Sequence, residues 1–399
     1  MKENMKIGID ARSVCQKQRG MPIYAWHVLK ILPTLLPEAR FVYFINTGFE
    51  HNEDVSVYST RVTELSSFSN VTVVDISDEG YMLWEQWKLW LACKKYQIDF
   101  LHMPANRVCF LQGKAQITTT HDMMEWDSLD ITKILKQKSP LRNKLYSLRC
   151  ALYTYLQYQI GLKLVRGIAT ISNFSKSHIL QAMPNLKTPI KVIYHGLPEI
   201  FVEAAKAPIN RISDRNGVLM LGGESDHKNP YNMLHSYSLL SKENKLKHPL
   251  TVIGIAPAHL RLFKEWCLNL DLVSHVTLKT WVDEHELVKA FATHRVFLFA
   301  SKTEGFGFPL IQSMAVATPV LSSEAEVLLE LSNKQLPHAP WNSPILLSNK
   351  LKKLLEDDEY WVETSKKAFA MSAKFTWEHS LSQLVEFYQR NAKYETCKQ

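Results

Sequence analysis

The chain has 399 residues, 46% of them apolar and 22% charged, so it is too long for one comfortable hydrophobic core and too apolar to stay disordered. A folded protein of two domains is therefore expected. Its 14 glycines and 17 prolines follow no period, and no segment of about 20 to 50 residues recurs, which excludes collagen-like, low-complexity and repeat architectures.

The first residues lack the basic segment and apolar stretch of a secretory signal, and no run of about 18 apolar residues occurs in the chain. We therefore expect a cytoplasmic protein without a membrane span. The six cysteines lie far apart and form no C-x-x-C pair, so the sequence suggests neither a disulfide framework nor a zinc site.

The net charge of +8 is confined to the N-terminal half of the chain. Residues 1–196 carry 24 Lys and Arg against 16 Asp and Glu, whereas residues 197–399 carry 23 of each kind. Within the first half, residues 131–166 hold no acid and eight bases: Lys133, Lys136, Lys138, Arg142, Lys144, Arg149, Lys163 and Arg166. Leucines with the spacing of one helix face follow Pro140 in this basic segment: Leu141, Leu145, Leu148, Leu152 and Leu156.

Strands alternate with helix-length segments in the N-terminal half. The expected strands are Lys6–Asp10, Phe41–Ile45, Val71–Val74, Phe100–Met103, Ile117–Thr120 and Gly167–Ile171. The expected helices are Pro22–Leu36, Leu83–Tyr96 and one capped by Ser172 or Asn173. The tryptophans of the second helix have helical spacing and are expected in the core: Trp84, Trp87 and Trp90.

The C-terminal half repeats this order of elements. Its expected strands are Val218–Leu221, Leu250–Ile255, Val276–Leu278 and Val296–Ala300. Its expected helices are Asn229–Leu240, Ala258–Leu268, Glu284–Phe291, Pro309–Ala315 and Leu381–Arg390. The pattern predicts an α/β protein with two doubly wound lobes, joined near residues 196–216, that face a cleft at the carboxyl ends of their strands.

The segment from Ser301 to Pro309 is the clearest candidate for a ligand site. Neither G-x-G-x-x-G nor a G-x-x-x-x-G-K-[ST] loop occurs, so dinucleotide oxidoreductases and P-loop NTPases lose their main support. The segment follows an apolar strand, contains two glycines and precedes a helix, whose N-terminus can bind a phosphate. Its carboxylate, Glu304, can bind sugar hydroxyls. These residues predict a site for a phosphorylated ligand.

The same segment resembles the hallmark of glycosyltransferase family 4, whose members are retaining GT-B enzymes that use nucleotide sugars. The resemblance rests on Glu304-Gly305-Phe306-Gly307 and on the run from Met314 to Val320. Further matching motifs occur in family order along nearly the whole chain: Ile9-Asp10-Ala11-Arg12, Thr120-His121-Asp122, Ala169-Thr170-Ile171-Ser172, Tyr194-His195-Gly196, Gly222-Gly223 with Lys228-Asn229, and Lys374-Phe375-Thr376-Trp377.

This resemblance implies a domain plan and an activity. Residues 1–196 would form an acceptor-side domain, residues 197–378 a nucleotide-sugar-binding domain, and residues 379–399 a helix that crosses back to the first domain. The enzyme would transfer a hexose, with retention, from a UDP- or GDP-linked sugar to a growing, lipid-linked glycan such as a bacterial surface polysaccharide. No metal and no cofactor are implied.

The resemblance also implies roles for individual residues. Lys228 would hold the diphosphate of the donor, Glu304 would bind hydroxyls of the transferred sugar, and His121 would face that sugar. Gln312 would contact the ribose, and the segment Thr280–Val282 would recognise the base. The full set implied to bind the nucleotide sugar is Gly20, Gly222, Gly223, Lys228, Asn229, Trp281, Val282, Gly305, Phe306, Gly307 and Gln312.

Each of these residues also has a purely structural interpretation. A histidine after a strand is more often packed in the core than catalytic, Lys228 alone would be a surface lysine, and Glu304 alone would be a helix cap. Their positions at strand ends beside glycines favour the functional interpretation. Gln312 by itself would be an ordinary residue of a helix surface.

Four positions depart from the family pattern: Gln312 in place of Glu, Gly223 in place of Arg, and Pro22 and Ala317 in place of Gly. They leave open a second hypothesis, a catalytically silent GT-B protein that binds a sugar nucleotide or pairs with an active glycosyltransferase. The retained Glu304, Lys228 and His121 favour the enzyme.

The basic segment indicates a partner for the N-terminal domain. Helical bases without acids, interleaved with tyrosines, suit an anionic membrane surface and a peripheral position on its cytoplasmic side. Nucleic acid is not expected, because no recognised binding module accompanies the bases. The residues expected to contact the membrane are Lys133, Lys136, Lys138, Arg142, Lys144 and Arg149.

Overall fold

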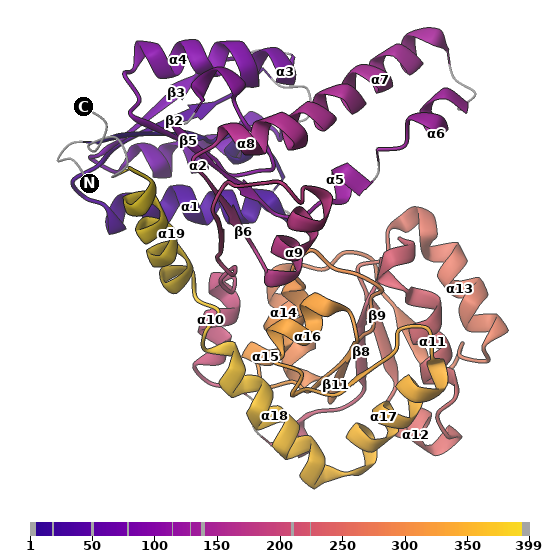
Figure 1. The fold of residues 1–399 in the computed structure, drawn as a ribbon. Coiled ribbons are helices and arrows are strands. Elements are labelled where there is room, and N and C mark those ends of the chain that lie inside the picture. Colours follow the sequence, from indigo (N-terminus) through magenta and orange to yellow (C-terminus); the bar gives the residue numbers. More distant parts are fainter. Residues whose placement is uncertain are drawn as a thin grey trace. The chain divides into compact units, whose positions relative to one another are not determined.

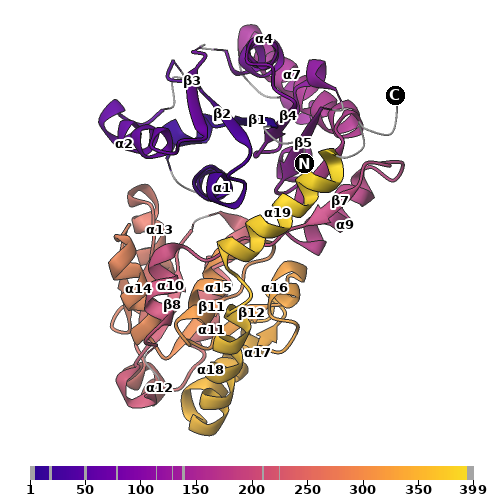
Figure 2. The same ribbon diagram turned by 90° about the vertical axis from the view of Figure 1, so that its left-hand side faces the viewer.

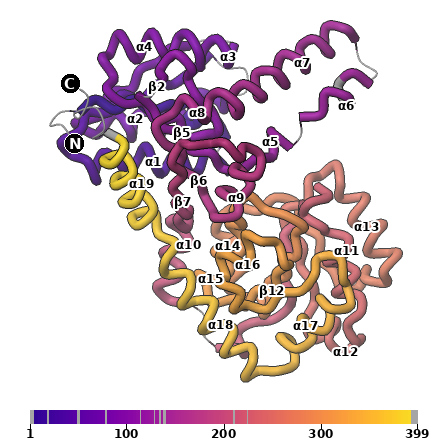
Figure 3. Tube along the Cα trace, viewed as in Figure 1, coloured from indigo at the N-terminus to yellow at the C-terminus, as the bar shows by residue number. Residues whose placement is uncertain are grey.

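The computed structural model of the chain forms two compact units. Unit 1 contains residues 1–195 and 377–399, and unit 2 contains residues 196–376. Figure 3 follows the chain by colour from unit 1 through unit 2 and back into unit 1. The structure describes residues 5–17, 20–48, 52–77, 80–113, 115–127, 129–136, 140–208, 211–223 and 225–392.

Unit 1 is built on a parallel sheet of seven strands in the order β3-β2-β1-β4-β5-β6-β7 (Figure 1). The strands are β1 (Lys6–Asp10), β2 (Arg40–Ile45), β3 (Val71–Asp75), β4 (Phe100–Met103), β5 (Gln116–Thr120), β6 (Gly167–Thr170) and β7 (Ile190–Val192). From β1 the chain adds strands in one direction up to β3, and it then returns to place β4 on the other side of β1.

Helices cover both faces of this sheet, because alternate strand residues point to opposite faces. On one face, Val42 and Phe44 of β2 pack against α4 (Leu89–Lys95). On the other face, the Tyr43 hydroxyl donates to the Leu29 carbonyl of α1 (Met21–Leu35) at 2.8 Å. Figure 2 shows α1 and α4 on opposite sides of the strands. Both faces are thus buried, as expected of a parallel sheet.

The remaining helices of unit 1 lie between these strands and at the end of the chain. They are α2 (Val55–Ser66), α3 (Tyr81–Leu83), α5 (Met124–Asp127), α6 (Ile131–Lys136), α7 (Leu141–Leu156), α8 (Leu162–Leu164), α9 (Asn173–Ala182) and α19 (Trp377–Ala392). The single helix expected over residues 83–96 was wrong in detail: α3 and α4 are joined by a π-helical segment, Trp84–Lys88. Trp84 is fully buried, but Trp87 is 51% exposed, so the expectation that Trp87 lies in the core was wrong.

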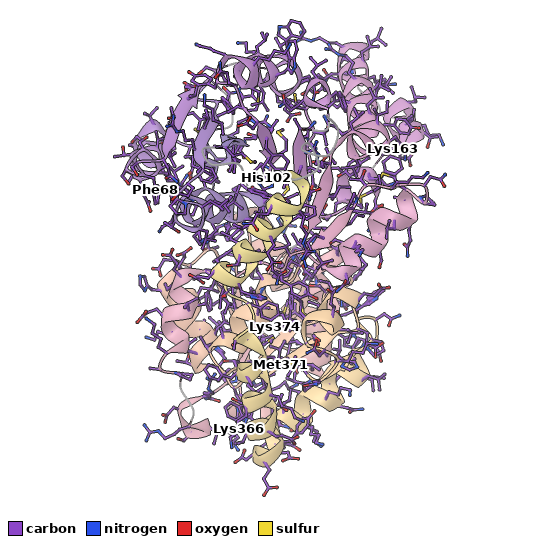
Figure 4. All side chains as sticks on the ribbon, turned by 60° about the vertical axis from the view of Figure 1, so that its left-hand side comes forward. Phe68, His102, Lys163, Lys366, Met371 and Lys374 are labelled. Atoms are coloured by element: carbon purple, nitrogen blue, oxygen red, sulfur yellow. The ribbon has the colours of Figure 1, made fainter. Side chains whose placement is uncertain are left out.

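The C-terminal helix α19 packs within unit 1. The Tyr388 hydroxyl lies 2.6 Å from Nδ1 of the buried His102, which is labelled beside α19 in Figure 4. Trp377 stacks on His27 with ring centroids 4.2 Å apart. A Cβ at Gly167 would lie 2.4 Å from the ring of Phe387, so only glycine lets this helix approach β6.

Unit 2 has a parallel sheet of six strands in the order β10-β9-β8-β11-β12-β13. The strands are β8 (Val218–Leu221), β9 (Leu250–Ile253), β10 (Val276–Leu278), β11 (Val296–Phe299), β12 (Val320–Ser323) and β13 (His338–Ala339). The helices are α10 (Glu199–Ala205), α11 (Pro230–Ser238), α12 (Lys242–Lys247), α13 (Leu260–Asn269), α14 (Glu284–Thr293), α15 (Phe308–Ala315), α16 (Glu326–Leu331), α17 (Pro344–Glu356) and α18 (Asp358–Ser372).

The two sheets share one arrangement of strands. In each, the first strand in sequence lies inside the sheet, and the chain reverses its direction of growth beside it, between β1 and β4 and between β8 and β11. The expected α/β class with two doubly wound lobes is confirmed. Open sheets of this kind bind ligands at the carboxyl ends of the strands where the strand order reverses. We call this place in each sheet its reversal point, and ligand sites are expected there.

Within the described part of the chain, no helix combines the length and apolarity that crossing a bilayer requires.

Candidate functional site

The reversal point of unit 2 brings together the two loops that the sequence analysis singled out. After β8 the chain passes Gly222 and Gly223 and forms a short 3₁₀ turn, Asp226–Lys228. After β11 it enters the loop that carries Glu304. The Lys302 amide of this second loop donates to the His227 carbonyl of the first at 2.8 Å. The two loops therefore form one joined structure at the edge of the sheet.

Lys228 and Glu304 form an ion pair at the centre of this structure. The Lys228 ammonium lies 2.9 Å from each carboxylate oxygen of Glu304. The Glu304 side chain is 8% exposed, whereas that of Lys228 is 32% exposed. A carboxylate held almost out of water and a lysine that still reaches solvent are thus joined at the reversal point. The sequence singled out both residues for separate roles at the donor and did not predict that they pair.

The glycines beside Lys228 are required by backbone geometry. Gly223 has φ of +135°, a conformation that side chains disfavour, and a Cβ there would lie 3.1 Å from Cγ of Lys228. A side chain at this position would therefore adopt a strained backbone conformation and require the Lys228 side chain to shift slightly. A Cβ at Gly222 would lie 3.0 Å from the backbone of Ile255. Glycine at position 223 is consequently consistent with Lys228 as the cation of the site.

The loop of Glu304 ends at the N-terminus of α15. Gly307 precedes this helix with φ of +95°, and a Cβ there would lie 2.8 Å from Cδ2 of Leu328. The Phe306 side chain is 4% exposed and packs edge-on against Phe308, with ring centroids 5.4 Å apart. Burial of this ring fixes the loop, and the positive end of the helix dipole follows Glu304 by four residues in the chain. Such an arrangement suits a phosphate group.

The other residues predicted to bind the donor occupy different surroundings. Asn229 is 5% exposed, and its amide donates to the carbonyls of Ala300 at 2.9 Å and Trp341 at 2.8 Å, so it joins the backbones of two loops. Gln312 is half-buried on α15. Trp281 is 59% exposed in the loop after β10.

Some predicted residues have contacts at the site and others do not. Gly222 and Trp281 both lie close to Gly254, which has φ of +90°. A Cβ on Gly222 would be 3.1 Å from the carbonyl carbon of Gly254, and a Cβ on Gly254 would be 3.8 Å from the Trp281 ring. Gly305 stands beside Glu304 in the loop. For Val282 and Gln312 the structure gives no contact with the ion pair.

The reversal point of unit 1 carries a polar pocket of about 310 Å³ that the sequence analysis did not identify. Residues after β1 and after β4 line it, together with residues of the π-helical segment. Its lining includes Asp10, Arg12, Asn46, Tyr81, Glu85, Ala105, Arg107 and Glu125. Acidic and basic side chains meet in this pocket. The pocket lies at the strand-order reversal of the unit 1 sheet, as the ion pair does in the unit 2 sheet.

A buried ion network organises this pocket. The Arg12 guanidinium donates two hydrogen bonds to Asp10, at 2.9 and 2.7 Å, and one to Glu85 at 2.8 Å. Glu85 is 2% exposed and also accepts a hydrogen bond from the Tyr153 hydroxyl of α7. Burial is the largest single influence on the pKa of Arg12 and lowers it, but the charges and hydrogen bonds of Asp10 and Glu85 together outweigh burial and raise the pKa above its ordinary value. Arg107 completes the network with an ion pair to Glu125 at 2.6 Å.

The sequence indicated some of the residues that line this pocket but not others. Asp10 and Arg12 belong to a motif that the resemblance included, but no role was assigned to them. Glu85 lies in a tryptophan-rich segment whose π-helical turn, a frequent feature of functional sites, has no sequence signature.

His121 and Gly20 also belong to unit 1. His121 is 3% exposed, and its Nε2 lies 2.8 Å from the Pro104 carbonyl, so this nitrogen carries the proton. Its ring packs edge-on against Tyr24 at 5.0 Å. Gly20 precedes α1 with φ of 60°, and a Cβ there would meet open space. Their predicted roles toward the donor remain predictions.

Buried histidines make the stability of unit 1 sensitive to acid. Burial lowers the pKa of His102 to about 3 and that of His121 to about 4, and burial together with His121 lowers the pKa of His195. Between pH 6.5 and 4 the unfolded chain binds protons that the folded chain does not. We expect the free energy of unfolding to be highest above pH 6.5 and to fall below it, by about 1.4 kcal/mol per pH unit for each histidine.

Urea unfolding at a series of pH values between 7.5 and 5 tests this expectation. The variant His102→Gln removes one of the titrating groups, so its stability should depend less steeply on pH than that of the wild type. An unchanged slope in the variant would show that His102 is not one of the groups responsible.

The bases predicted to contact a membrane lie on α6 and α7 or between them. Arg142 and Arg149 of α7 and Lys136 of α6 are exposed, and Lys144 is half-buried, with its ammonium 3.0 Å from the Leu135 carbonyl. Lys138 and the side chain of Lys133 lie outside the described residues. No group of three or more potential metal ligands occurs among the residues that the structure describes.

Part of the chain is similar in sequence to known glycosyltransferases. Residues 202–371, which contain both loops of the ion pair, match the family model described as glycosyl transferases group 1. The chain is 24% identical over 235 residues to the O-antigen chain mannosyltransferase B of Escherichia coli. That alignment covers 55% of this chain but only 60% of the relative's own length.

Solved structures show the same fold across nearly the whole chain. A glycosyltransferase from Rickettsia africae ESF-5 covers 98% of this chain and 100% of its own at a TM-score of 0.69 and 16% identity. Anabaena Alr3699/HepE, solved in complex with UDP and glucose, covers 97% of this chain and 100% of its own at a TM-score of 0.65 and 14% identity. The chain therefore has the GT-B fold, with two Rossmann-like sheets.

Proposed function

We propose that this protein, whose residues 202–371 match the glycosyl transferases group 1 model, is a hexosyltransferase that uses a nucleotide sugar. The observation that carries the proposal is the Lys228–Glu304 ion pair at the reversal point of unit 2. The similarity to an O-antigen mannosyltransferase supports a growing surface polysaccharide as the acceptor and mannose as the first sugar to test. Membership of glycosyltransferase family 4 and retention of configuration are parts of the same proposal.

The chemistry of the proposed reaction follows from these two side chains. As the bond between the sugar and the diphosphate breaks, negative charge grows on the departing phosphate, and the Lys228 ammonium stabilises it. The α15 N-terminus adds a second positive contribution. Glu304 accepts hydrogen bonds from hydroxyls of the sugar and so fixes its position. Lys228 and the helix supply the charge stabilisation, so the proposal invokes neither a metal nor a cofactor.

The polar pocket of unit 1 is proposed to bind the acceptor glycan. Asp10 and Glu85 offer carboxylate oxygens, and Arg12 and Arg107 offer guanidinium donors, within a pocket of about 310 Å³. Hydrogen-bond donors and acceptors of both signs of charge suit the hydroxyls of a sugar.

The acceptor is proposed to be lipid-linked, with the protein at the cytoplasmic face of a membrane. The support is the charge pattern: bases on α6 and α7, and no acid over residues 131–166. Each base near an anionic surface contributes about 1 kcal/mol of attraction.

The second candidate function is a catalytically silent GT-B protein that binds a sugar nucleotide or pairs with an active relative. Gln312, which replaces a carboxylate of the family pattern, favours it. Incubation with a panel of UDP- and GDP-linked hexoses distinguishes the two functions. Release of UDP or GDP supports the enzyme, whereas calorimetric binding without release, even when glycan acceptors are added, supports the silent protein. Absence of both binding and release contradicts the two proposals together.

Glu304→Gln is expected to separate binding from turnover. Because Glu304 neutralises Lys228 at 2.9 Å, removing its charge leaves the ammonium available to the diphosphate. We expect UDP or GDP, whichever is the donor base, to bind at least as tightly as to the wild type. Sugar transfer should fall about 10²-fold, since a charged acceptor for the sugar hydroxyls is lost.

Calorimetry with the nucleoside diphosphate and initial-rate kinetics with the full donor measure the two effects in the same preparation. Glu363→Gln is a matched control, because Glu363 pairs with Lys367 on α18 at 2.6 Å and lies on another element. Weaker nucleotide binding in Glu304→Gln than in this control would contradict the expected competition for Lys228.

A further inference from the structure

The second cavity of interest in unit 1 is an apolar groove of about 720 Å³ beside α7. Three stretches of chain form it: α5, the start of α6, and α7. Its lining is Trp126, Leu129, Ile131, Leu148, Ala151, Leu152 and Tyr155. No charged side chain is among these residues, in contrast to the polar pocket at the reversal point.

One side of α7 is firmly attached to unit 1. Tyr153 is 8% exposed and donates to the buried Glu85. In the π-helical segment that follows α7, Gln157 is 1% exposed and accepts from the Val108 amide at 2.7 Å. These buried polar contacts fix the rotation of α7 about its axis. Because one side of the helix is held against unit 1, the opposite side is exposed.

The leucines of the other side face the groove or the solvent. Leu152, which belongs to the amphipathic leucine pattern of the sequence, is 59% exposed, and Tyr155 is 49% exposed. In Figure 1 the beginning of α7 and the neighbouring α6 extend away from the sheet of their own unit. Contiguous exposed apolar surface is uncommon on soluble proteins and marks a binding surface.

An aromatic wall gives the groove a defined shape. The rings of Trp126 and Tyr155 stack with centroids 5.8 Å apart and an angle of 24° between their planes. Tyr158, which is buried, supports Trp126 from behind at 5.9 Å. A cavity with rigid aromatic and aliphatic walls, in the size range of small-ligand sites, suits a flexible hydrocarbon chain.

Positive charge borders the groove. Lys144 precedes Leu148 by one helical turn, and its ammonium lies 3.0 Å from the Leu135 carbonyl of α6. Arg149 is also exposed on this helix, about 100° around the helix axis from Leu148. Of the nearby acids of α5, Glu125 forms an ion pair with Arg107 at 2.6 Å, and Asp127 lies 3.2 Å from Nε2 of His178.

We propose that this groove binds the hydrocarbon chain of a lipid phosphate, with Lys144 contacting the phosphate. The proposal rests on the proposed function, in which such a lipid would carry the acceptor glycan. A concave groove built from three segments and bordered by a cation matches a single apolar chain with one anionic end. Through Tyr153, the helix that lines the groove also contacts the polar pocket proposed for the glycan.

The test uses the full chain and farnesyl monophosphate below its critical micelle concentration, with binding followed by calorimetry. We expect saturable binding of one molecule per chain, clearly weaker binding of the shorter geranyl monophosphate, and little competition by inorganic phosphate. The double variant Leu148→Gln/Leu152→Gln should bind at least 10-fold more weakly. The matched control is Leu246→Gln/Leu268→Gln, which changes two exposed leucines of unit 2.

The outcomes separate the alternatives. Equal affinity in the groove variant and its control overturns the proposal, as does binding that is insensitive to chain length and abolished by inorganic phosphate. Attachment to vesicles containing phosphatidylglycerol without binding of the monomeric lipid also overturns it, because the groove would then be part of a bilayer-contacting surface. Should Leu148→Gln reduce folding, the single variant Leu152→Gln, at a more exposed position, serves in its place.

Failure of this proposal can be distinguished from failure of the proposed function. Release of UDP or GDP from the donor is measured with water-soluble glycan acceptors, which do not need the groove. Normal release together with absent lipid binding rejects the groove alone, whereas lipid binding without any use or binding of a donor rejects the transferase.

Discussion

Lys228→Ala is expected to lower kcat/KM for the preferred donor by about 10²- to 10³-fold, equivalent to about 2.7–4 kcal/mol of lost transition-state stabilisation. Lys228 is the cation that the structure places beside Glu304, and the position where the family pattern has arginine is Gly223, which supplies no second cation. The charge that grows on the departing diphosphate would therefore lose its main side-chain partner.

Kinetics over a range of donor concentrations test this expectation, because a transition-state role lowers kcat and not only the affinity for the donor. Lys367→Ala is the matched control, since Lys367 also pairs with a glutamate at 2.6 Å but lies on α18. A loss confined to KM, or no greater than that of the control, would show that Lys228 does not stabilise the leaving group.

Arg12→Ala is expected to destabilise unit 1 by about 3 kcal/mol. The substitution removes two hydrogen bonds to Asp10 and one to Glu85, and it leaves two nearly buried carboxylates close together. Removing one partner of a buried ion pair typically costs about 3–5 kcal/mol, and Arg107, whose Nε lies 3.6 Å from Glu85, offsets part of that loss.

Urea unfolding measures this effect. The control is Arg261→Ala, because Arg261 is 90% exposed and its solvent-screened pair with Glu265 should contribute little to stability. The double variant Arg12→Ala/Glu85→Gln should recover part of the lost stability, since it removes one of the unpaired charges. A double variant less stable than Arg12→Ala would contradict the assignment of the loss to charge.

The sequence predicted the parts of the protein whose determinants are local. Apolar runs gave the central strands β1, β8 and β11, and the glycine-containing loop after β11 indicated a ligand site. Gly223 was less easily interpreted: as a departure from the family pattern it suggested a weakened site, whereas its φ of +135° and its closeness to Lys228 show a position adapted to glycine.

Features that depend on distant pairs could not be predicted in the same way. Glu85 lies 73 residues from Arg12, and nothing in its tryptophan-rich surroundings indicates that it is buried with charged partners. Periodicity placed Leu148 and Leu152 on one face of a helix, but it cannot show whether another element covers that face. Only the contacts of Tyr153 on the opposite side reveal that the leucines remain open.

The placement of α19 has a consequence for synthesis of the protein. Residues 1–195 leave the ribosome first, but Tyr388 and Phe387, which pack against His102 and Gly167, are made only after all of unit 2. At about 5–20 residues per second, this interval lasts roughly 10–40 s. During this interval the nascent N-terminal unit lacks the helix that packs against α1 and β4, so we expect its apolar surface there to stay exposed until α19 is made, whereas unit 2 is continuous in sequence.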